Sequence, residues 1–243
     1  MTDETELDEP ERTPLMDALT YPIRGNGRYL MVTGAVLLAL FDLASGAIIV
    51  GGAATLLAAA YMNAYYFDIV ETTVSGRDEA PDWPDAADPL NDFGLPFLRM
   101  LFALLVSFGP LLLQMFLSGD SAGWGLGNWL LLLVGAIYFP MAILNIIISN
   151  EWEGAMPQRV VPRIIKAMPG YLGLTGLLLA SLVASYALNA LLGRVPFLGG
   201  LLSAGAWLYF AMAEARLAGL FYRRHLEMEE EAEDESGKVD VVE

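Results

Sequence analysis

The residues that most resemble a catalytic motif are Gly119 to Gly123, which match the G-x-S-x-G nucleophile elbow of hydrolases with Ser121 at the centre. That elbow works because a strand-to-helix turn exposes the serine beside a histidine. Here the motif lies between two long apolar stretches, and the one histidine, His225, follows the last of them. A membrane of about 30 Å would separate Ser121 from His225. A Ser-His-Asp triad is therefore excluded, and a Gly/Ser-rich turn is predicted.

Carboxylates cluster between residues 78 and 92, where oxygen ligands could hold a hard cation. The run lacks the alternating Asp/Asn ligands and the central glycine of an EF-hand loop, and it contains Pro81, Pro84 and Pro89. We therefore interpret it as a solvated acidic loop, with Trp83 anchored at the headgroup interface. Its acids are Asp78, Glu79, Asp82, Asp85, Asp88 and Asp92.

A third set of polar residues lies within the apolar stretches, where ionisable side chains are costly and often functional. At about 1.5 Å per residue, Glu214 lies roughly 12 Å inside the predicted membrane boundary. The set shares one half of the membrane, so it could line a polar cavity open to the cytoplasm, with Arg99 or Arg216 pairing with Asp68 or Glu214. The alternative is that these groups tie helices together, each hydrogen bond contributing about 0.6 kcal/mol. The set is Asn63, Asp68, Arg99, Asn145, Glu214 and Arg216.

The distribution of charge indicates which elements hold these residues. The 243 residues are 56% apolar, yet 29 acids against 13 bases give a net charge of -16. Residues 1–28, 71–94 and 223–243 carry this whole excess, and the neutral remainder holds nearly all the long apolar runs. Because a membrane-spanning helix needs about 20 mostly apolar residues, the sequence predicts an all-α integral membrane protein with a bundle of six transmembrane helices. The predicted spans are residues 29–43, 47–70, 95–117, 126–149, 170–192 and 197–222.

Short connections pair these spans into three antiparallel hairpins, so all tight turns lie on one side and both tails on the other. Of the 13 Lys and Arg residues, only Arg194 lies on the side of the turns. Cytoplasmic loops carry the excess of Lys and Arg. We therefore predict a multi-pass protein of the bacterial inner membrane with both termini in the cytoplasm. Its parts are an acidic N-terminal segment (1–28), a six-helix domain (29–222) that includes the acidic loop 71–94, and a disordered acidic tail (223–243).

A short, Pro-punctuated segment precedes each hairpin, and Pro157 to Pro169 is the clearest. Its apolar residues recur at helical spacing, and a basic strip occupies the other face, as an interfacial amphipathic helix requires. Residues 15–23 and 83–96 are the equivalents, so the chain is predicted to repeat an interfacial segment plus a hairpin three times. The alternative is that any hairpin bundle has juxtamembrane helices. The basic strip is Arg159, Arg163 and Lys166.

Three short motifs resemble a loose group of bacterial membrane proteins of unknown function. They are Arg163-Ile-Ile-Lys-Ala-Met-Pro-Gly-Tyr-Leu172, Asp82-Trp-Pro-Asp85 and Ala215-Arg-Leu-Ala-Gly-Leu-Phe-Tyr-Arg-Arg224. The resemblance covers about residues 15–224 and implies a fold of repeated interfacial segments and hairpins. It implies no activity and no cofactor.

The remaining features limit the function. With no cysteine there is no thiol nucleophile or thiolate metal site, and the acidic segments oppose nucleic-acid binding. Small residues recur every four positions at Ala211, Ala215 and Gly219, a spacing that favours close helix packing within one chain or between copies in an oligomer.

We therefore expect a non-enzymatic protein without a cofactor, a membrane scaffold or accessory subunit. Its acidic cytoplasmic face would engage a basic protein partner or cations, and the bilayer would surround its spans. The alternative is a small-solute transporter or channel with a polar vestibule around Glu214 that faces the cytoplasm.

Overall fold

The computed structural model describes residues 13–44, 48–84, 87–118, 125–195 and 198–227, and within these residues it is helical, with no strand. Each of the six predicted spans falls mainly on one helix. These helices are α2 (Gly27–Ala44), α3 (Ile48–Val74), α4 (Leu95–Ser118), α5 (Leu126–Ser149), α7 (Met168–Leu192) and α8 (Gly199–Tyr222). The shorter elements are α1 (Pro14–Thr20), α6 (Pro157–Lys166), the 3-10 turns η1 (Tyr21–Ile23) and η3 (Trp152–Ala155), and the π-helical turns η2 (Leu90–Gly94) and η4 (Arg223–Glu227).

Three helices in the described part of the chain are long and apolar enough to cross a membrane: Leu90–Ser118, Leu126–Ser149 and Met168–Leu192. Gly27–Leu40 is apolar but shorter. The helices α3 and α8 are of spanning length, but they carry four of the predicted polar residues, which lower their mean hydropathy. These are Asn63, Asp68, Glu214 and Arg216.

Large apolar side chains are exposed along these helices. Phe116, Leu117 and Leu126 are 84%, 73% and 77% exposed, and Val183 and Tyr186 on α7 are similarly open. A soluble monomer rarely leaves so much contiguous apolar surface in water. The exposed apolar surface therefore indicates, as the three long apolar helices do, a protein that sits in a membrane.

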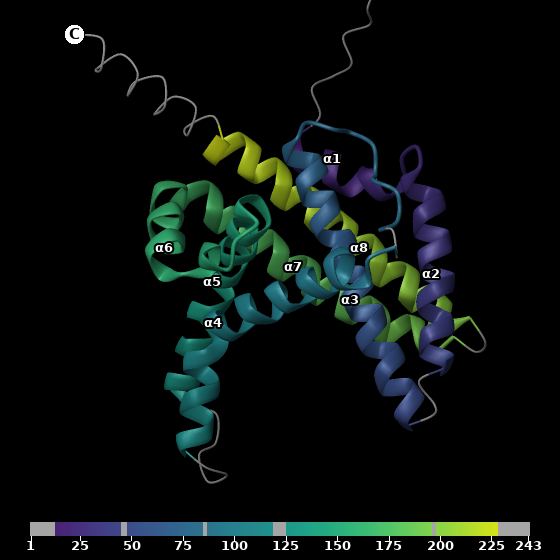
Figure 1. Cartoon of the computed structure of the whole chain (residues 1–243), viewed down its shortest axis with the longest axis horizontal. Helices are drawn as coiled ribbons and strands as arrows, with labels where there is room; N and C mark the ends of the chain where they lie inside the picture. Colours follow the sequence, from purple (N-terminus) through teal and green to yellow (C-terminus); the bar gives the residue numbers. More distant parts are fainter. Residues whose placement is uncertain (1–12, 45–47, 85–86, 119–124, 196–197, 228–243) are drawn as a thin grey trace, which may run out of the picture.

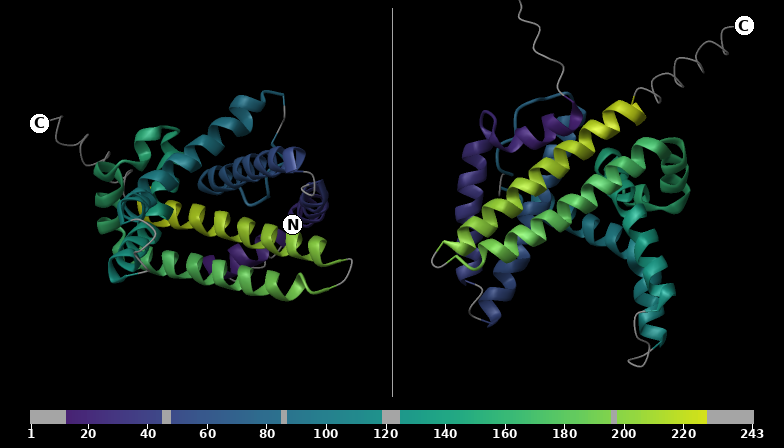
Figure 2. Two further views of the ribbon diagram at one scale, coloured as in Figure 1. Left: turned by 90° about the horizontal axis from the view of Figure 1, so that it is seen from below. Right: turned by 180° about the vertical axis from the view of Figure 1, so that it is seen from behind.

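Helix α8 lies at the centre of the arrangement and packs against α1, α2, α3 and α7. The hairpins α2–α3 and α4–α5 diverge as two legs, and the ends of these helices at the hairpin turns point away from α1 and from the end of α8 (Figure 1). Helices α7 and α8 run side by side (Figure 2).

Gly219 permits the closest approach of α8 to α3. A Cβ atom at Gly219 would lie 2.6 Å from the Cβ of Thr73 and 3.1 Å from the carbonyl oxygen of Val70. Ala215, one turn earlier, is fully buried. The small-residue face around Ala215 and Gly219 therefore packs within the chain, against α3.

Two of the three predicted interfacial segments are helical. Residues 15–23 form α1 and η1, and α6 buries Val160 and Ile164 on one face. Residues 83–96 do not form a helix from their start: 81–84 have no regular structure, and helical turns begin only near Leu90. Pro81, Pro84 and Pro89 explain the difference, since proline lacks the N–H that helix hydrogen bonding needs and restricts the residue before it.

Trp83 packs onto the helices of the first hairpin. Its ring lies 4.5 Å from that of Tyr65 and 5.7 Å from that of Tyr61, centroid to centroid. Its Nε1 donates a hydrogen bond to Oγ1 of Thr33 on α2 over 3.2 Å. The middle of the acidic loop is therefore tied to the first hairpin.

Candidate functional site

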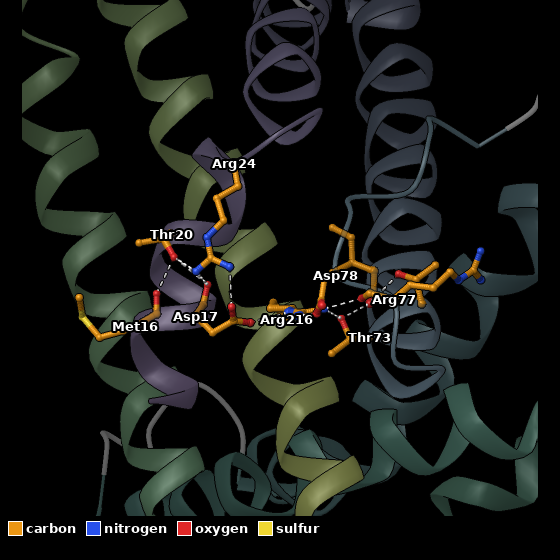
Figure 3. A network of polar contacts seen from close by, with 10 residues as sticks. Met16, Asp17, Thr20, Arg24, Thr73, Arg77, Asp78 and Arg216 are labelled. Carbon is orange, nitrogen blue, oxygen red and sulfur yellow. Dashed lines mark hydrogen bonds and ion pairs between the residues drawn. The ribbon is translucent and has the colours of Figure 1, made fainter. Parts of the chain in front are cut away.

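Arg216 on α8 is the centre of a polar network that joins three parts of the chain, shown in Figure 3. Its side chain is 3% exposed, and its Nε donates to Oδ2 of Asp17 over 2.9 Å. Its Nη2 donates to Oδ1 of Asp78 over 2.7 Å. Its Nη1 donates to the carbonyl oxygen of Arg77 over 2.7 Å and to Oγ1 of Thr73 over 3.4 Å. All three guanidinium nitrogens therefore have partners.

Asp17 connects this network to the N-terminal helix. Its Oδ1 accepts a hydrogen bond of 2.6 Å from Nη1 of Arg24, whose Nη2 also contacts Thr20. Burial raises the pKa of Asp17, but the hydrogen bonds from Arg24 and Arg216 outweigh this and hold the pKa below its ordinary value. The guanidinium of Arg216 also lies 5.0 Å from the centroid of the Tyr21 ring, a cation–π geometry.

The predicted pairing of Arg216 with Asp68 or Glu214 is therefore wrong. Arg216 instead binds acids from the two acidic segments, one on α1 and one after α3. Because a buried charge is tolerated only when it is paired and hydrogen-bonded, this network holds three parts of the chain together. Four of the five N–H donors of Arg216 bind groups of the chain itself.

Glu214 faces a different part of the molecule. Its Oε1 accepts a hydrogen bond from the hydroxyl of Ser181 on α7. It also lines a cavity of about 480 Å³ between α3, α4, α7 and α8, together with Asn63, Ser185 and Asn189. Of the six polar residues predicted to line one cavity, two line this one, Asn63 and Glu214.

Asn63 on α3 is a buried amide without a hydrogen-bond partner. The residue is 8% exposed, and neither Oδ1 nor Nδ2 has a partner among the described residues. Buried polar groups are nearly always hydrogen-bonded, because leaving one unsatisfied costs about 1–3 kcal/mol. The amide lines the same cavity as Glu214, so a ligand in that cavity could complete its hydrogen bonds.

Asp68 and Arg99 line a second cavity, of about 280 Å³, with Glu71, Asp92 and Asn150. Arg99 on α4 donates through Nη2 to the carbonyl oxygen of Asn150 over 2.9 Å, and its Nη1 contacts the Asn150 amide oxygen. Asn150 ends α5 in a left-handed conformation, with φ of 56°. Arg99 therefore caps the end of the neighbouring helix.

Asn145, the last member of the predicted set, lies elsewhere. Its Oδ1 accepts a hydrogen bond of 2.7 Å from Nη1 of Arg163 on α6. In the same strip, Arg159 pairs with Glu151 at 2.7 Å and with Glu153 at 2.9 Å. Arg159 and Arg163 thus bind side chains of the same chain. Lys166, the third residue of the basic strip, is not without a partner either.

Sequence reasoning missed Asp17, Asp78, Thr73 and Ser181 as partners. Asp17 offered a signal, because it stands on the amphipathic stretch 15–23 rather than in the polar run before it. Asp78 offered none, since it is one of six similar acids in its loop. Within the described residues no three acidic or histidine side chains gather as metal ligands. Asp85 and the segment 119–123 with its G-x-S-x-G pattern lie outside those residues.

Comparison with protein-family models, with curated proteins and with solved structures gives no match for this chain. The site is therefore interpreted from its geometry.

Proposed function

We propose that this protein is a non-enzymatic membrane scaffold or accessory subunit with six spans. In this proposal it lies in the bacterial inner membrane, with both termini and the acidic loop in the cytoplasm. The three long apolar helices support insertion in a membrane. The basic residues, nearly all predicted on the side of the tails, support this orientation.

The observation that carries the proposal is the network of Arg216. Asp17 belongs to the acidic segment 1–28 and Asp78 to the acidic loop 71–94, and α8 leads into the acidic tail 223–243. By joining Asp17 and Asp78 to one helix, Arg216 keeps these acidic segments at the same end of the bundle. Summed acidic charge on one face attracts basic protein surfaces and cations and repels nucleic acid.

Deleting residues 228–243 tests the scaffold function. We expect the truncated chain to reach the membrane at normal levels but to lose proteins that co-purify with the full chain after cross-linking. A full-length chain with the tail acids changed to Gln and Asn is the matched control for tail length, and we expect it to lose them as well. An unaltered set of co-purifying proteins in both variants would contradict the scaffold.

The orientation has its own test, because the chain contains no cysteine. Single cysteines at Ser45, Ser121 and Arg194 should react with an impermeant thiol reagent added outside intact cells. Cysteines at Ser75 and Ser236 should react only after the cells are opened. The reverse pattern would overturn the topology.

A small-solute transporter or channel is the second candidate, and the cavity beside Glu214 favours it. In that case Glu214→Gln would abolish solute flux while the amount of protein in the membrane stays unchanged. Flux that survives the substitution would remove this candidate.

A further inference from the structure

The cavity beside Glu214 combines a large apolar wall with one charged group. Four helices line it, and its wall includes Met62, Phe97, Leu182 and Phe210. Its volume of about 480 Å³ is within the range of small-molecule sites, roughly 300–1,000 Å³. Among the described residues that line it, Glu214 is the only one with a formal charge. The cavity therefore suits a mainly apolar molecule with one polar end.

At the polar end of the cavity, hydrogen-bond acceptors remain that could receive further donors. Glu214 receives a hydrogen bond from Ser181 at Oε1, and Oδ1 of the buried Asn63 receives none within the described residues. Arg216 cannot neutralise Glu214, because its nitrogens bind Asp17, Asp78, Thr73 and the carbonyl of Arg77. A carboxylate inside a membrane normally has a partner. Glu214 has the Ser181 hydroxyl as a partner, but the described residues that line the cavity include no cation, so a cationic ligand fits this end best.

The other end of the cavity is open at the apolar surface of the bundle. Tyr186 and Leu182 on α7 are 78% and 62% exposed, and Trp207 on α8 is 45% exposed. All three line the cavity. On helices that cross a membrane, such side chains face lipid chains, so a ligand can enter from the bilayer.

We propose that this cavity binds an amphiphile dissolved in the membrane, a single apolar chain that ends in a protonated amine. The ammonium group has three donors and no acceptor, and it would donate to Glu214 and to Oδ1 of Asn63. The apolar chain lies along the wall of α3, α7 and α8 and leaves toward the lipid past Tyr186. The proposal does not depend on the scaffold function, which concerns the acidic end of the bundle.

Fluorescence quenching tests the proposal on the full chain in phosphatidylcholine nanodiscs. The probes are bromine-labelled dodecylamine, dodecanol and dodecanoic acid, and the signal is the quenching lost when Trp207 is changed to Phe. We expect saturable quenching by the amine, an apparent Kd for the alcohol that is about tenfold higher or more, and no saturation by the acid. Equal Kd values for the amine and the alcohol would overturn the proposal.

Glu214→Gln keeps the shape of the side chain and removes its charge. We expect it to raise the Kd of the amine about tenfold or more and to leave the Kd of the alcohol unchanged. Glu79→Gln, the same change in the exposed loop, is the matched control and should bind the amine like the wild type. An unchanged amine Kd in folded Glu214→Gln would contradict the proposal. If that variant does not fold, the comparison of the amine Kd with the alcohol Kd on the wild-type protein is the test of the proposal.

A second copy of the chain is the competing occupant of this face. It would block the amine and would let a Tyr186→Cys variant form disulfide-linked dimers in the membrane. Dimers of this kind together with no saturable quenching by the amine would overturn the proposal, and monomers that bind the amine support it.

Discussion

Arg216 and Glu214 stand two residues apart on α8 but have opposite surroundings. Arg216 is 3% exposed, and each of its three nitrogens binds an acceptor from α1 or from the chain at the end of α3. Among the described residues, Glu214 accepts a hydrogen bond from Ser181 and lines a cavity with the unpartnered amide of Asn63. Two residues along an α-helix turn the side chain by about 200°, so each residue faces a different group of helices.

This difference separates a polar group that belongs to the fold from one that is open to a ligand. Depth in the membrane does not distinguish them, since both lie in the same half of the predicted bilayer. The number of satisfied donors and acceptors does distinguish them, because a buried polar group without partners costs free energy that a bound partner recovers. The predictions below perturb one side of α8 at a time.

The largest effect is expected from Arg216→Met. It removes one of the two arginine partners of the mostly buried Asp17 and the ion pair that joins α1 to α8, so we expect a loss of about 3 kcal/mol or more in unfolding free energy. Unfolding in mixed micelles with increasing sodium dodecyl sulfate measures this loss. Arg216→Lys, which keeps the charge but not the fork of donors, should lose less. Equal stability of wild type and Arg216→Met would show that the network does not hold the fold.

Gly219→Val tests the contact on the same side of α8. A Cβ atom there would lie 2.6 Å from that of Thr73, so we expect a loss of about 1–3 kcal/mol from overpacking. Gly173→Val on α7, where a Cβ meets nothing within 4 Å, is the matched control for the change in helix propensity. If the same micelle titration gives similar losses of unfolding free energy for both variants, the close contact between α3 and α8 is contradicted.

Asn63→Leu should have the opposite sign. Removing a buried amide without partners recovers its desolvation cost, so we expect a gain of about 1 kcal/mol in stability. The same variant should bind the amine more weakly, because Oδ1 is lost. A destabilised Asn63→Leu would mean that the amide has a structural partner in the folded protein.

The smallest effect concerns pH and Asp17. Its pKa in the folded protein is below the ordinary value of 3.8, so its contribution to stability is present above that value and is lost as the pH falls through the lower folded pKa. The stability of Asp17→Asn should therefore approach that of the wild type as the pH is lowered from about 5 to about 2. Thermal unfolding of both proteins across this range measures the difference, and a constant difference would contradict the pairing.

The helices could be read from the sequence because each predicted span is a local feature. Residues 126–149 were predicted as a span, and α5 covers the same residues. A run of about 20 apolar residues between polar or glycine-rich ends leaves few other structures in a membrane. The prolines of the acidic loop are also plain in the sequence, and they disfavour a continuous helix over 83–96.

The partners of the polar residues could not be read in the same way. Arg216 and Asp17 are 199 positions apart in the chain, and Arg216 and Asp78 are 138 apart. Their contact depends on how α1, α3 and α8 cross, which no local pattern specifies. Asn63 and Glu214, by contrast, lie at similar depth in the predicted spans, which makes a shared cavity one of two interpretations, and in the structure they line one cavity.

The most direct measurement of the separate roles of Glu214 and Arg216 is thermal unfolding in phosphatidylcholine nanodiscs with and without dodecylamine. A ligand that binds the folded state raises the unfolding temperature. We predict that Glu214→Gln unfolds at the wild-type temperature without the amine and lacks the increase that the amine gives the wild type. Arg216→Met should unfold at a lower temperature but retain that increase. If Glu214→Gln is destabilised as much as Arg216→Met, or still responds to the amine, the separation of the two sides of α8 is wrong.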